Sequence, residues 1–247
     1  MEEKIKNILD FAIHAPSGEN CQPWRFKVQN NEIHIYNIPE RDNSLYNWGQ
    51  RPSYVAHGAS IENIRIAAPA FGYTIETILF PDSTNQNYIA HITLTDGPTE
   101  IHPLFPFIQK RATNRRPYAD FTLTPGQREE LSRTLQDSER TRLLFLETPS
   151  DKKSIAIATA GNERILFENR FMHTFFYSHI TWTQAEDTKQ KLGFFIKTFE
   201  LPPPAQFMFK LAKGWNFVRL LNKIGFSSES SSINSFKSVA KRSIVKP

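Results

Sequence analysis

Two short segments of the chain combine residue types that could bind a flat, phosphorylated ligand. The first is residues 15–26, APSGENCQPWRF, in which proline, serine and glycine shape an irregular backbone beside Asn20 and Gln22. Amide side chains offer paired donors and acceptors, and Trp24 adds a flat apolar face, so the segment suits a planar ligand rimmed with amide-like groups. A plain helix-to-strand loop, in which the amides cap backbone groups, is the alternative that composition leaves open.

The second segment is residues 111–116, RATNRR. Three guanidinium groups, a hydroxyl and an amide within six residues suit a phosphate, because arginine donates bidentately and stays charged. A solvated basic turn is the alternative, since a run of charges commonly forms an exposed surface.

Other chemical signatures are absent from the sequence. It contains no GxGxxG, no GxxxxGK[ST], no GxSxG and no HExxH pattern. The single Cys21 excludes an internal disulfide and is expected to be a small buried residue rather than a nucleophile. The seven histidines do not cluster along the chain, so we expect each to be a surface or hydrogen-bonded core residue and none to bind a metal.

Composition and charge narrow the class of protein further. The chain has 247 residues, with 30 Lys and Arg against 25 Asp and Glu. From Glu200 onward there are eight basic and two acidic residues, so the excess lies in the tail and the body lacks the basic surface that nucleic acid binding needs. No apolar run is long enough to predict a membrane-spanning helix, and the acidic start, Met1-Glu2-Glu3-Lys4, is unlike a signal peptide. We therefore expect a cytoplasmic protein.

The elements that must position the two segments are a mixture of helices and strands. Alternating residues predict strands at 24–28 and 32–36 around an Asn-containing turn, because asparagine tolerates the positive φ of a tight turn. A buried helix over 51–71 is expected to be kinked or shortened by Pro69 and to end at Gly72. The pattern predicts helices at 2–14, 124–135, 151–169 and 207–224, strands at 74–80, 88–94 and 143–146, an aromatic segment at 171–182 and a Ser-rich stretch at 227–238. The class is therefore α+β.

Taken together, the two segments resemble the motifs of a known family. APSGENCQPWRF is similar to the ApS-x-x-N-x-QPW signature of the flavin-dependent nitroreductases, and RATNRRPY resembles their phosphate-binding R-x-[ST]-x-R-x-[FY] motif. Residues 54–64, continuing to Gly72 and Tyr73, resemble the long central helix of that family. Here the APS motif precedes the arginine motif by about ninety residues, an order that resembles the Acg-like branch, in which two half-units in one chain imitate the usual dimer.

The resemblance implies a nitroreductase-like sandwich fold, a central antiparallel or mixed sheet covered by helices and pseudo-dimeric within one chain. Its halves would be residues 1–97, with the APS motif, and 98–225, with the arginine motif and a candidate lid, followed by a basic tail at 226–247. It also implies noncovalently bound FMN, reduced by NAD(P)H and oxidised by an electron-poor nitro compound or quinone, with no catalytic side chain required. The residues implied to bind FMN are Pro16, Ser17, Asn20, Gln22, Arg111, Thr113, Asn114, Arg115 and Arg116.

Three alternatives accompany this interpretation. Members of the family usually continue beyond the point where the resemblance fades, near Ser235, so a C-terminal part is expected to be missing and FMN affinity could be impaired. The aromatic 171–182 segment and the 205–224 helix could act as a lid, which would make the protein a flavin store with little turnover. Alternatively, the basic amphipathic helix at 207–224 could bind a membrane surface or a protein partner. Homodimer formation is left open.

Overall fold

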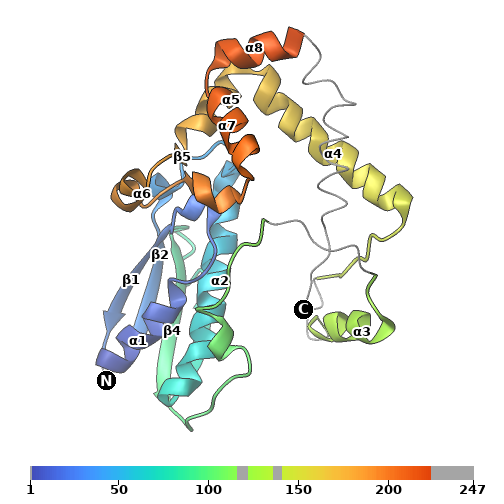
Figure 1. The fold of residues 1–247 in the computed structure, drawn as a ribbon. Helices are drawn as coiled ribbons and strands as arrows, with labels where there is room; N and C mark the ends of the chain where they lie inside the picture. The colour runs from blue at the N-terminus through green and yellow to red at the C-terminus, as the bar shows by residue number, and fades with distance from the viewer. Residues whose placement is uncertain (1, 116–121, 136–140, 224–247) are drawn as a thin grey trace. The chain divides into compact units, whose positions relative to one another are not determined.

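The chain folds into two compact units in a computed structural model that describes residues 2–115, 122–135 and 141–223 (Figure 1). The first unit comprises Met1–Thr113 and Thr181–Phe195, and the second comprises Asn114–Ile180 and Ile196–Pro247. Arg116 and the tail at 226–247, both singled out in the sequence, lie outside the described residues. The sequence halves 1–97 and 98–225 remain a prediction.

The first unit is built around a four-stranded antiparallel sheet in the order β1-β2-β4-β3. Two helices, α1 and α2, accompany it, and a later segment, Thr181–Phe195, adds the short helix α6 and the two-stranded β5–β6 sheet apart from Ile180, the last residue of the second unit before Ile196. In chain order the elements are α1 (Glu2–Ala12), β1 (Trp24–Gln29), β2 (Glu32–Asn37), α2 (Arg51–Ala67), β3 (Tyr73–Leu79), β4 (Tyr88–Asp96), β5 (Ile180–Thr181), α6 (Gln184–Gln190) and β6 (Phe194–Phe195).

The core of this unit lies between one face of the sheet and the two helices. Along β2, Ile33 and Ile35 are buried while Glu32, His34 and Tyr36 are partly exposed, because successive side chains of a strand point to opposite faces. α1 contributes Ile5 and Ile8, and α2 contributes Ile64, all almost fully buried in the same cluster. The other face of the sheet therefore carries the polar and aromatic side chains.

The turns of this unit follow the sequence signals. The predicted hairpin is confirmed, and Asn30 adopts a φ of 53° at its turn. α2 ends at Ala67 and continues as a 3₁₀ helix, Ala68–Phe71, that contains Pro69 and ends at Gly72 with a φ of 81°. Proline lacks the N–H that an α-helix needs, and glycine tolerates the left-handed end, so the predicted shortening is confirmed.

The second unit is described as helices and short connections. Its helices are α3 (Pro125–Arg133), α4 (Pro149–Glu168), α5 (Arg170–Ser178), α7 (Pro203–Leu211) and α8 (Trp215–Lys223). Thr124 and Thr148 begin α3 and α4 with capping boxes, each threonine oxygen accepting from the backbone three residues on. Asn222 Nδ2 donates to the Phe167 carbonyl oxygen at 2.6 Å, which joins α8 to α4.

Two expectations for this unit are wrong. Residues 143–146 form no strand; the described part of this unit supplies no strand to satisfy their backbone groups. The helix expected at 207–224 is two nine-residue helices, α7 and α8, that meet near Gly214. Glycine is a poor helix former, which explains the break. Val218 of α8 is fully buried, whereas Phe207, Met208 and Leu220 are exposed.

The class is α+β, with an antiparallel sheet and several helices, as expected for a nitroreductase-like fold. Within the described ranges, no helix has both the length and the apolar character required to cross a membrane.

Candidate functional site

The loop between α1 and β1 has an unusual backbone. Residues Gly18–Asn20 form a single 3₁₀ turn, and Glu19, Asn20 and Gln22 all have positive φ values, of 50°, 57° and 47°. Such values are uncommon outside glycine and each costs free energy, so the surrounding structure must hold the loop in this shape. Strained loops of this kind are frequent at ligand-binding sites.

Three hydrogen bonds hold the loop from different sides. Within the loop, the Gln22 N–H donates to Ser17 Oγ at 3.0 Å. Arg41 Nε donates to the Cys21 carbonyl oxygen at 2.9 Å, and the Gly193 N–H donates to the Glu19 carbonyl oxygen at 2.7 Å. With its backbone fixed in this way, the loop leaves the side chains of Pro16 and Asn20 exposed to solvent.

A buried polar cluster supports the loop from beneath. Ser53 Oγ donates to Asp42 Oδ2 at 3.2 Å, and Asn47 Nδ2 donates to both the Asp42 carbonyl oxygen and Ser53 Oγ. Burial, with the Asp42 carboxylate, raises the pKa of the Cys21 thiol to about 12. A thiol with so high a pKa is protonated at neutral pH, so the expectation that Cys21 is a buried residue is confirmed.

A second buried polar cluster is formed by His57 of α2 and Asn37 of β2. His57 is fully buried, and its Nε2 lies 3.0 Å from Asn37 Oδ1, while Asn37 Nδ2 donates to Gln50 Oε1 at 3.0 Å. Burial lowers the pKa of His57 to about 4, so this imidazole is neutral under ordinary conditions. The edge of Trp24 faces the imidazole, with ring centroids 6.3 Å apart. Trp24 is itself buried, and its ring therefore serves the core beneath the loop.

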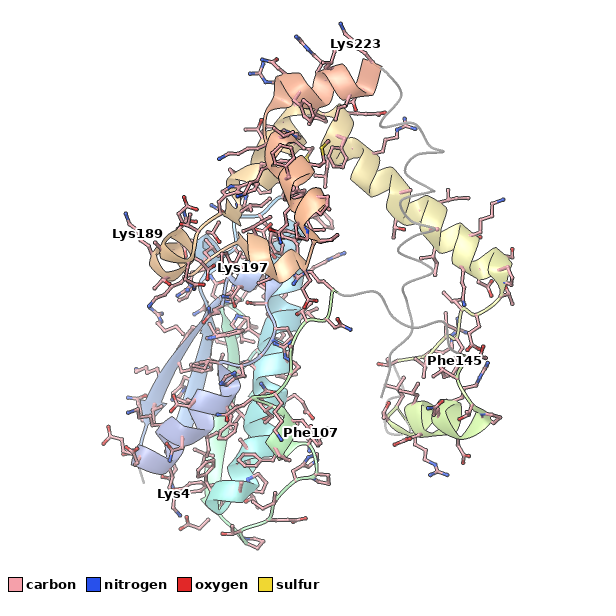
Figure 2. The ribbon with its side chains drawn as sticks, viewed as in Figure 1. Lys4, Phe107, Phe145, Lys189, Lys197 and Lys223 are labelled. Carbon is pink, nitrogen blue, oxygen red and sulfur yellow. The ribbon has the colours of Figure 1, made fainter. Side chains whose placement is uncertain are left out.

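Arg111 is brought to this loop from far along the chain. Its Nη2 donates to the His14 carbonyl oxygen at 3.2 Å, across 97 residues of sequence. The backbone N–H of Arg111 donates to the carbonyl oxygen of Phe107, which is labelled in Figure 2, at 2.9 Å. The first residue of the arginine motif thus lies beside the residue that directly precedes the APS motif, and its guanidinium is exposed.

The remaining residues of the arginine motif divide between the units. Thr113 is the last residue of the segment Met1–Thr113 of the first unit, and it is exposed. Asn114 and Arg115 belong to the second unit. Arg115 Nη1 donates to the Thr198 carbonyl oxygen at 3.3 Å, and its guanidinium lies 5.8 Å from the centre of the Phe199 ring. Each unit therefore holds part of the motif.

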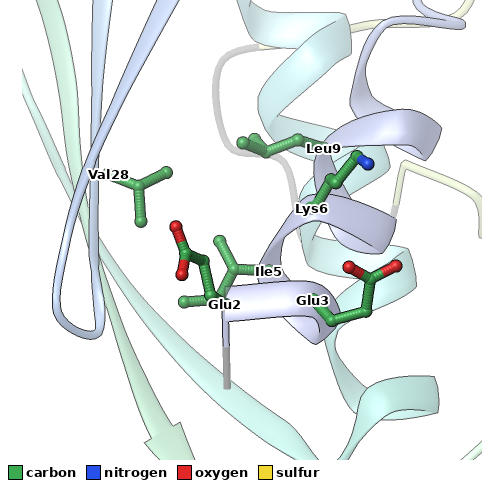
Figure 3. Close-up of a pocket in the computed structure, with 6 residues that line it drawn as sticks. All are labelled: Glu2, Glu3, Ile5, Lys6, Leu9 and Val28. Atoms are coloured by element: carbon green, nitrogen blue, oxygen red, sulfur yellow. The ribbon is translucent and has the colours of Figure 1, made fainter.

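Two surface hollows in the first unit have different chemistry. One, of about 320 Å³, adjoins Arg111 and is lined also by Asn63, Ile66, Leu104, Phe107, Ile108 and Lys110. A larger one, of about 650 Å³, lies at the start of α1 and is lined by Glu2, Glu3, Ile5, Lys6, Leu9 and Val28 (Figure 3). Its two carboxylates would repel a phosphate, and the hollow lies at the opposite end of α1 from the APS loop, so it is a poor candidate for the predicted ligand.

Sequence spacing did not predict one group of three side chains of metal-ligating types. Glu32, His34 and His91 each offer a ligand atom within 4.8 Å of the others, so two histidines that lie far apart along the chain come together in the fold. The cause is strand pairing, which places His34 opposite His91 in the β2–β4 register. The alternation Glu32-Ile33-His34 was the available signal, because it puts both polar residues on one face, but the partner strand could not be identified from it.

The chain is similar in sequence to several known proteins. The family described as "Putative TM nitroreductase" matches residues 1–62, which contain the APS loop. The "Putative NAD(P)H nitroreductase acg" of Mycobacterium tuberculosis strain H37Rv is 26% identical over 194 residues, which are 75% of this chain and 56% of that protein. The "Putative NAD(P)H nitroreductase Rv3131" of the same strain is 24% identical over 133 residues, 50% of this chain and 37% of that protein.

A third relative carries no activity in its name. The "Uncharacterized protein MT1398" of Mycobacterium tuberculosis strain CDC 1551 is 29% identical over 199 residues, 78% of this chain and 27% of that protein. The matched region thus spans little more than half of the acg protein's length and less of the other two.

Proposed function

The matches support the nitroreductase family and its Acg-like members at modest identity, and from that premise we propose that the chain is an FMN-dependent NAD(P)H oxidoreductase. The observation that carries the proposal is the hydrogen bond from Arg111 to the His14 carbonyl oxygen. It brings a guanidinium, the group best suited to a phosphate, beside the strained loop whose residues match the flavin signature. The donors present at this loop therefore fit the two ends of a flavin mononucleotide.

The APS loop would hold the ring and ribityl end of the cofactor. Asn20 is exposed and its backbone is fixed by neighbouring hydrogen bonds, so its amide is available without further ordering of the chain. Pro16, Ser17 and Gln22 are the neighbouring contacts that the proposal assigns to the same end. Because hydrogen bonds within the chain fix the loop backbone, little conformational entropy would be lost on binding.

The arginine motif would hold the phosphate. Arg111 retains an exposed guanidinium, and Thr113, Asn114, Arg115 and Arg116 are proposed to complete the phosphate contacts. The pseudo-dimeric organisation that the motif order implies is part of this proposal. Bound FMN supplies the redox chemistry, accepting a hydride from NAD(P)H and passing it to a nitro compound or quinone.

The protein's part is to orient the ring and to stabilise charge. Cys21 of the loop is not poised as a nucleophile, since its thiol is protonated and buried. This agrees with a reaction between stacked rings that needs no proton donor from the protein. The matches to nitroreductases do not favour flavin storage or a membrane-surface role.

Binding of FMN and of riboflavin to the purified full chain tests the proposal. The two ligands share a ring and differ by the phosphate, so Arg111→Ala should weaken FMN binding about 10–100-fold, the value of one charge-assisted hydrogen bond, and leave riboflavin binding unchanged. Lys110→Ala is the matched control, because it removes the same charge from the neighbouring residue. It should leave both affinities intact.

Activity is measured on the same preparations. Addition of NADPH or NADH without oxygen should bleach the flavin absorption, and a quinone or nitro compound should restore it. A protein that binds no flavin after incubation with excess FMN would refute the proposed function. Equal loss of FMN and riboflavin affinity in Arg111→Ala would refute the phosphate contact alone.

A further inference from the structure

The outer face of the sheet carries a group of three metal-ligating side chains. Glu32 and His34 alternate along β2 and therefore point to the same side, and His91 of β4 is the register partner of His34. Their ligand atoms lie within 4.8 Å of one another. All three belong to the first unit and lie on the face of the sheet opposite the apolar core.

The distances between these atoms are close to those of a metal site. Glu32 Oε2 lies 3.6 Å from His34 Nε2, and Glu32 Oε1 lies 3.5 Å from His91 Nε2. Around a tetrahedral zinc ion with bonds of about 2.0–2.1 Å, ligand atoms lie about 3.3–3.4 Å apart. The two imidazole rings are stacked, with centroids 4.7 Å apart and planes 12° from parallel. Because the three ligand atoms lie within 4.8 Å of one another, a shift of about 1 Å in the widest pair would bring them to one ion.

The two imidazole nitrogens that face the carboxylate lack hydrogen bonds. His34 Nε2 and His91 Nε2 are both buried and have no hydrogen-bond partner in the part of the chain that the structure describes. His34 Nδ1 lies 2.5 Å from Tyr88 Oη. If that nitrogen carries the proton and donates to the phenol oxygen, His34 Nε2 presents its lone pair to the carboxylate. Two acceptors at this distance repel each other unless a cation lies between them.

The surroundings supply the support that metal-binding histidines normally have. A ligating imidazole usually donates its other N–H to an oxygen, which fixes the tautomer and the ring. Tyr88 is placed to do this for His34, and burial raises the pKa of its phenol, which keeps the hydroxyl neutral. Lys27, the register partner of His34 on β1, adds a positive charge to the same face and weakens the attraction for a cation. Glu32 provides the compensating negative charge.

We propose that Glu32, His34 and His91 form a binding site for a divalent transition-metal ion, zinc by preference, that links β2 to β4. Two imidazoles and one carboxylate favour zinc and its neighbours in the first transition row over magnesium or calcium, which prefer oxygen ligands. Three protein ligands leave a fourth position for water. The site is independent of the flavin chemistry proposed above.

The full chain, produced without a polyhistidine tag, is treated with a chelator, and the chelator is then removed. Metal binding is measured on this metal-free protein. Cobalt(II) should bind with a stoichiometry of one and give the intense visible absorption of a tetrahedral site, and zinc should abolish that absorption by displacement. Competition with a chromophoric chelator then gives the zinc affinity. Zinc should also raise the melting temperature of the protein, because an ion that binds only the folded state stabilises it.

Four variants locate the site. Glu32→Gln keeps the shape of a half-exposed side chain, and His91→Gln removes one imidazole, so each should weaken zinc binding by about 10–100-fold or more while the metal-free proteins melt as wild type. Tyr88→Phe should weaken binding about 10-fold through the loss of its contact with His34. His102→Gln, a histidine of the same unit outside the cluster, should bind as wild type.

The result that overturns the proposal is specific. Absence of binding at one equivalent would exclude the site, and so would unchanged affinity in both Glu32→Gln and His91→Gln, because the metal would then be held elsewhere. Should His91→Gln melt early without metal, the half-exposed Glu32→Gln variant decides the question alone. None of these outcomes depends on whether the protein binds FMN.

Discussion

Replacement of the buried His57 by glutamine should remove about 2 kcal/mol of the acid sensitivity of the first unit. His57 is fully buried, and burial lowers its pKa from 6.5 to about 4. Glutamine does not titrate, and its amide N–H can donate to Asn37 Oδ1 in place of the imidazole. The variant thus keeps a hydrogen bond to Asn37 and cannot ionise.

The size of the effect follows from the two pKa values. Between pH 4 and 6.5 the unfolded chain binds a proton at this histidine and the folded chain does not, so stability falls as the pH falls. From about pH 7.5 to about pH 5 the loss from His57 is about 2 kcal/mol. His34, whose pKa is also lowered, chiefly by burial, adds to the loss in the same direction. The difference between wild type and His57→Gln isolates the contribution of His57.

Hydrogen exchange at the amides of Ile33 and Ile92 provides the assay. These residues pair in the two central strands, so their slowest exchange reports opening of the whole sheet. We expect the opening free energy of wild type to fall by about 2 kcal/mol more than that of His57→Gln between the two pH values. At the higher pH the variant should be about 1–3 kcal/mol less stable than wild type, because the buried glutamine has polar groups to satisfy.

Equal pH dependence in the two proteins would refute the reasoning. It would mean that His57 binds its proton equally well in the folded and unfolded chain and is accessible to water. A larger fall in His57→Gln than in wild type would reverse the sign and refute it as well.

Three further predictions test how tightly side chains of the first unit are packed. The Cys21 thiol, whose pKa is raised to about 12, should react with a maleimide at about pH 8 at a small fraction of its rate in the unfolded chain, and rapid labelling of folded protein would contradict its burial. Gly97→Ala should lower the free energy of unfolding, measured in urea, by about 1–3 kcal/mol, because the new Cβ would lie 2.8 Å from Thr74 Cγ2. The double variant with Thr74→Ser lacks that methyl group and should recover part of the loss. Ile92→Ala should cost about 2–5 kcal/mol in the same assay, because the side chain is fully buried, and a loss below about 1 kcal/mol would contradict its place in the core.

Local patterns were sufficient for most elements of the first unit. The alternation on either side of Asn30 predicted the hairpin, and Pro69 with Gly72 predicted how α2 ends, because both depend on neighbouring residues alone. The strand expected at 143–146 was wrong because a strand needs a partner that the local pattern does not reveal. The single helix expected at 207–224 overlooked the break near Gly214.

The sequence predicted the two segments of the candidate site but not how they come together in space. The contact of Arg111 with the His14 carbonyl spans 97 residues, and no spacing rule gives a contact at that distance. The same limit hid the Glu32, His34 and His91 cluster, which exists only in the β2–β4 register. The buried support, such as Asp42 beneath the loop, gave no sequence signal because a lone acidic residue is usually exposed.

The discontinuity of the first unit has a consequence for biosynthesis. Residues 181–195 belong to this unit, and Gly193 donates to the Glu19 carbonyl within the strained loop. A ribosome that has finished residue 113 must add about 80 more residues, which takes roughly 4–16 s at ordinary elongation rates, before that bond can form. During translation the nascent loop would lack one of its anchors. A truncated gene that ends after residue 113 should yield a protein in which this loop relaxes.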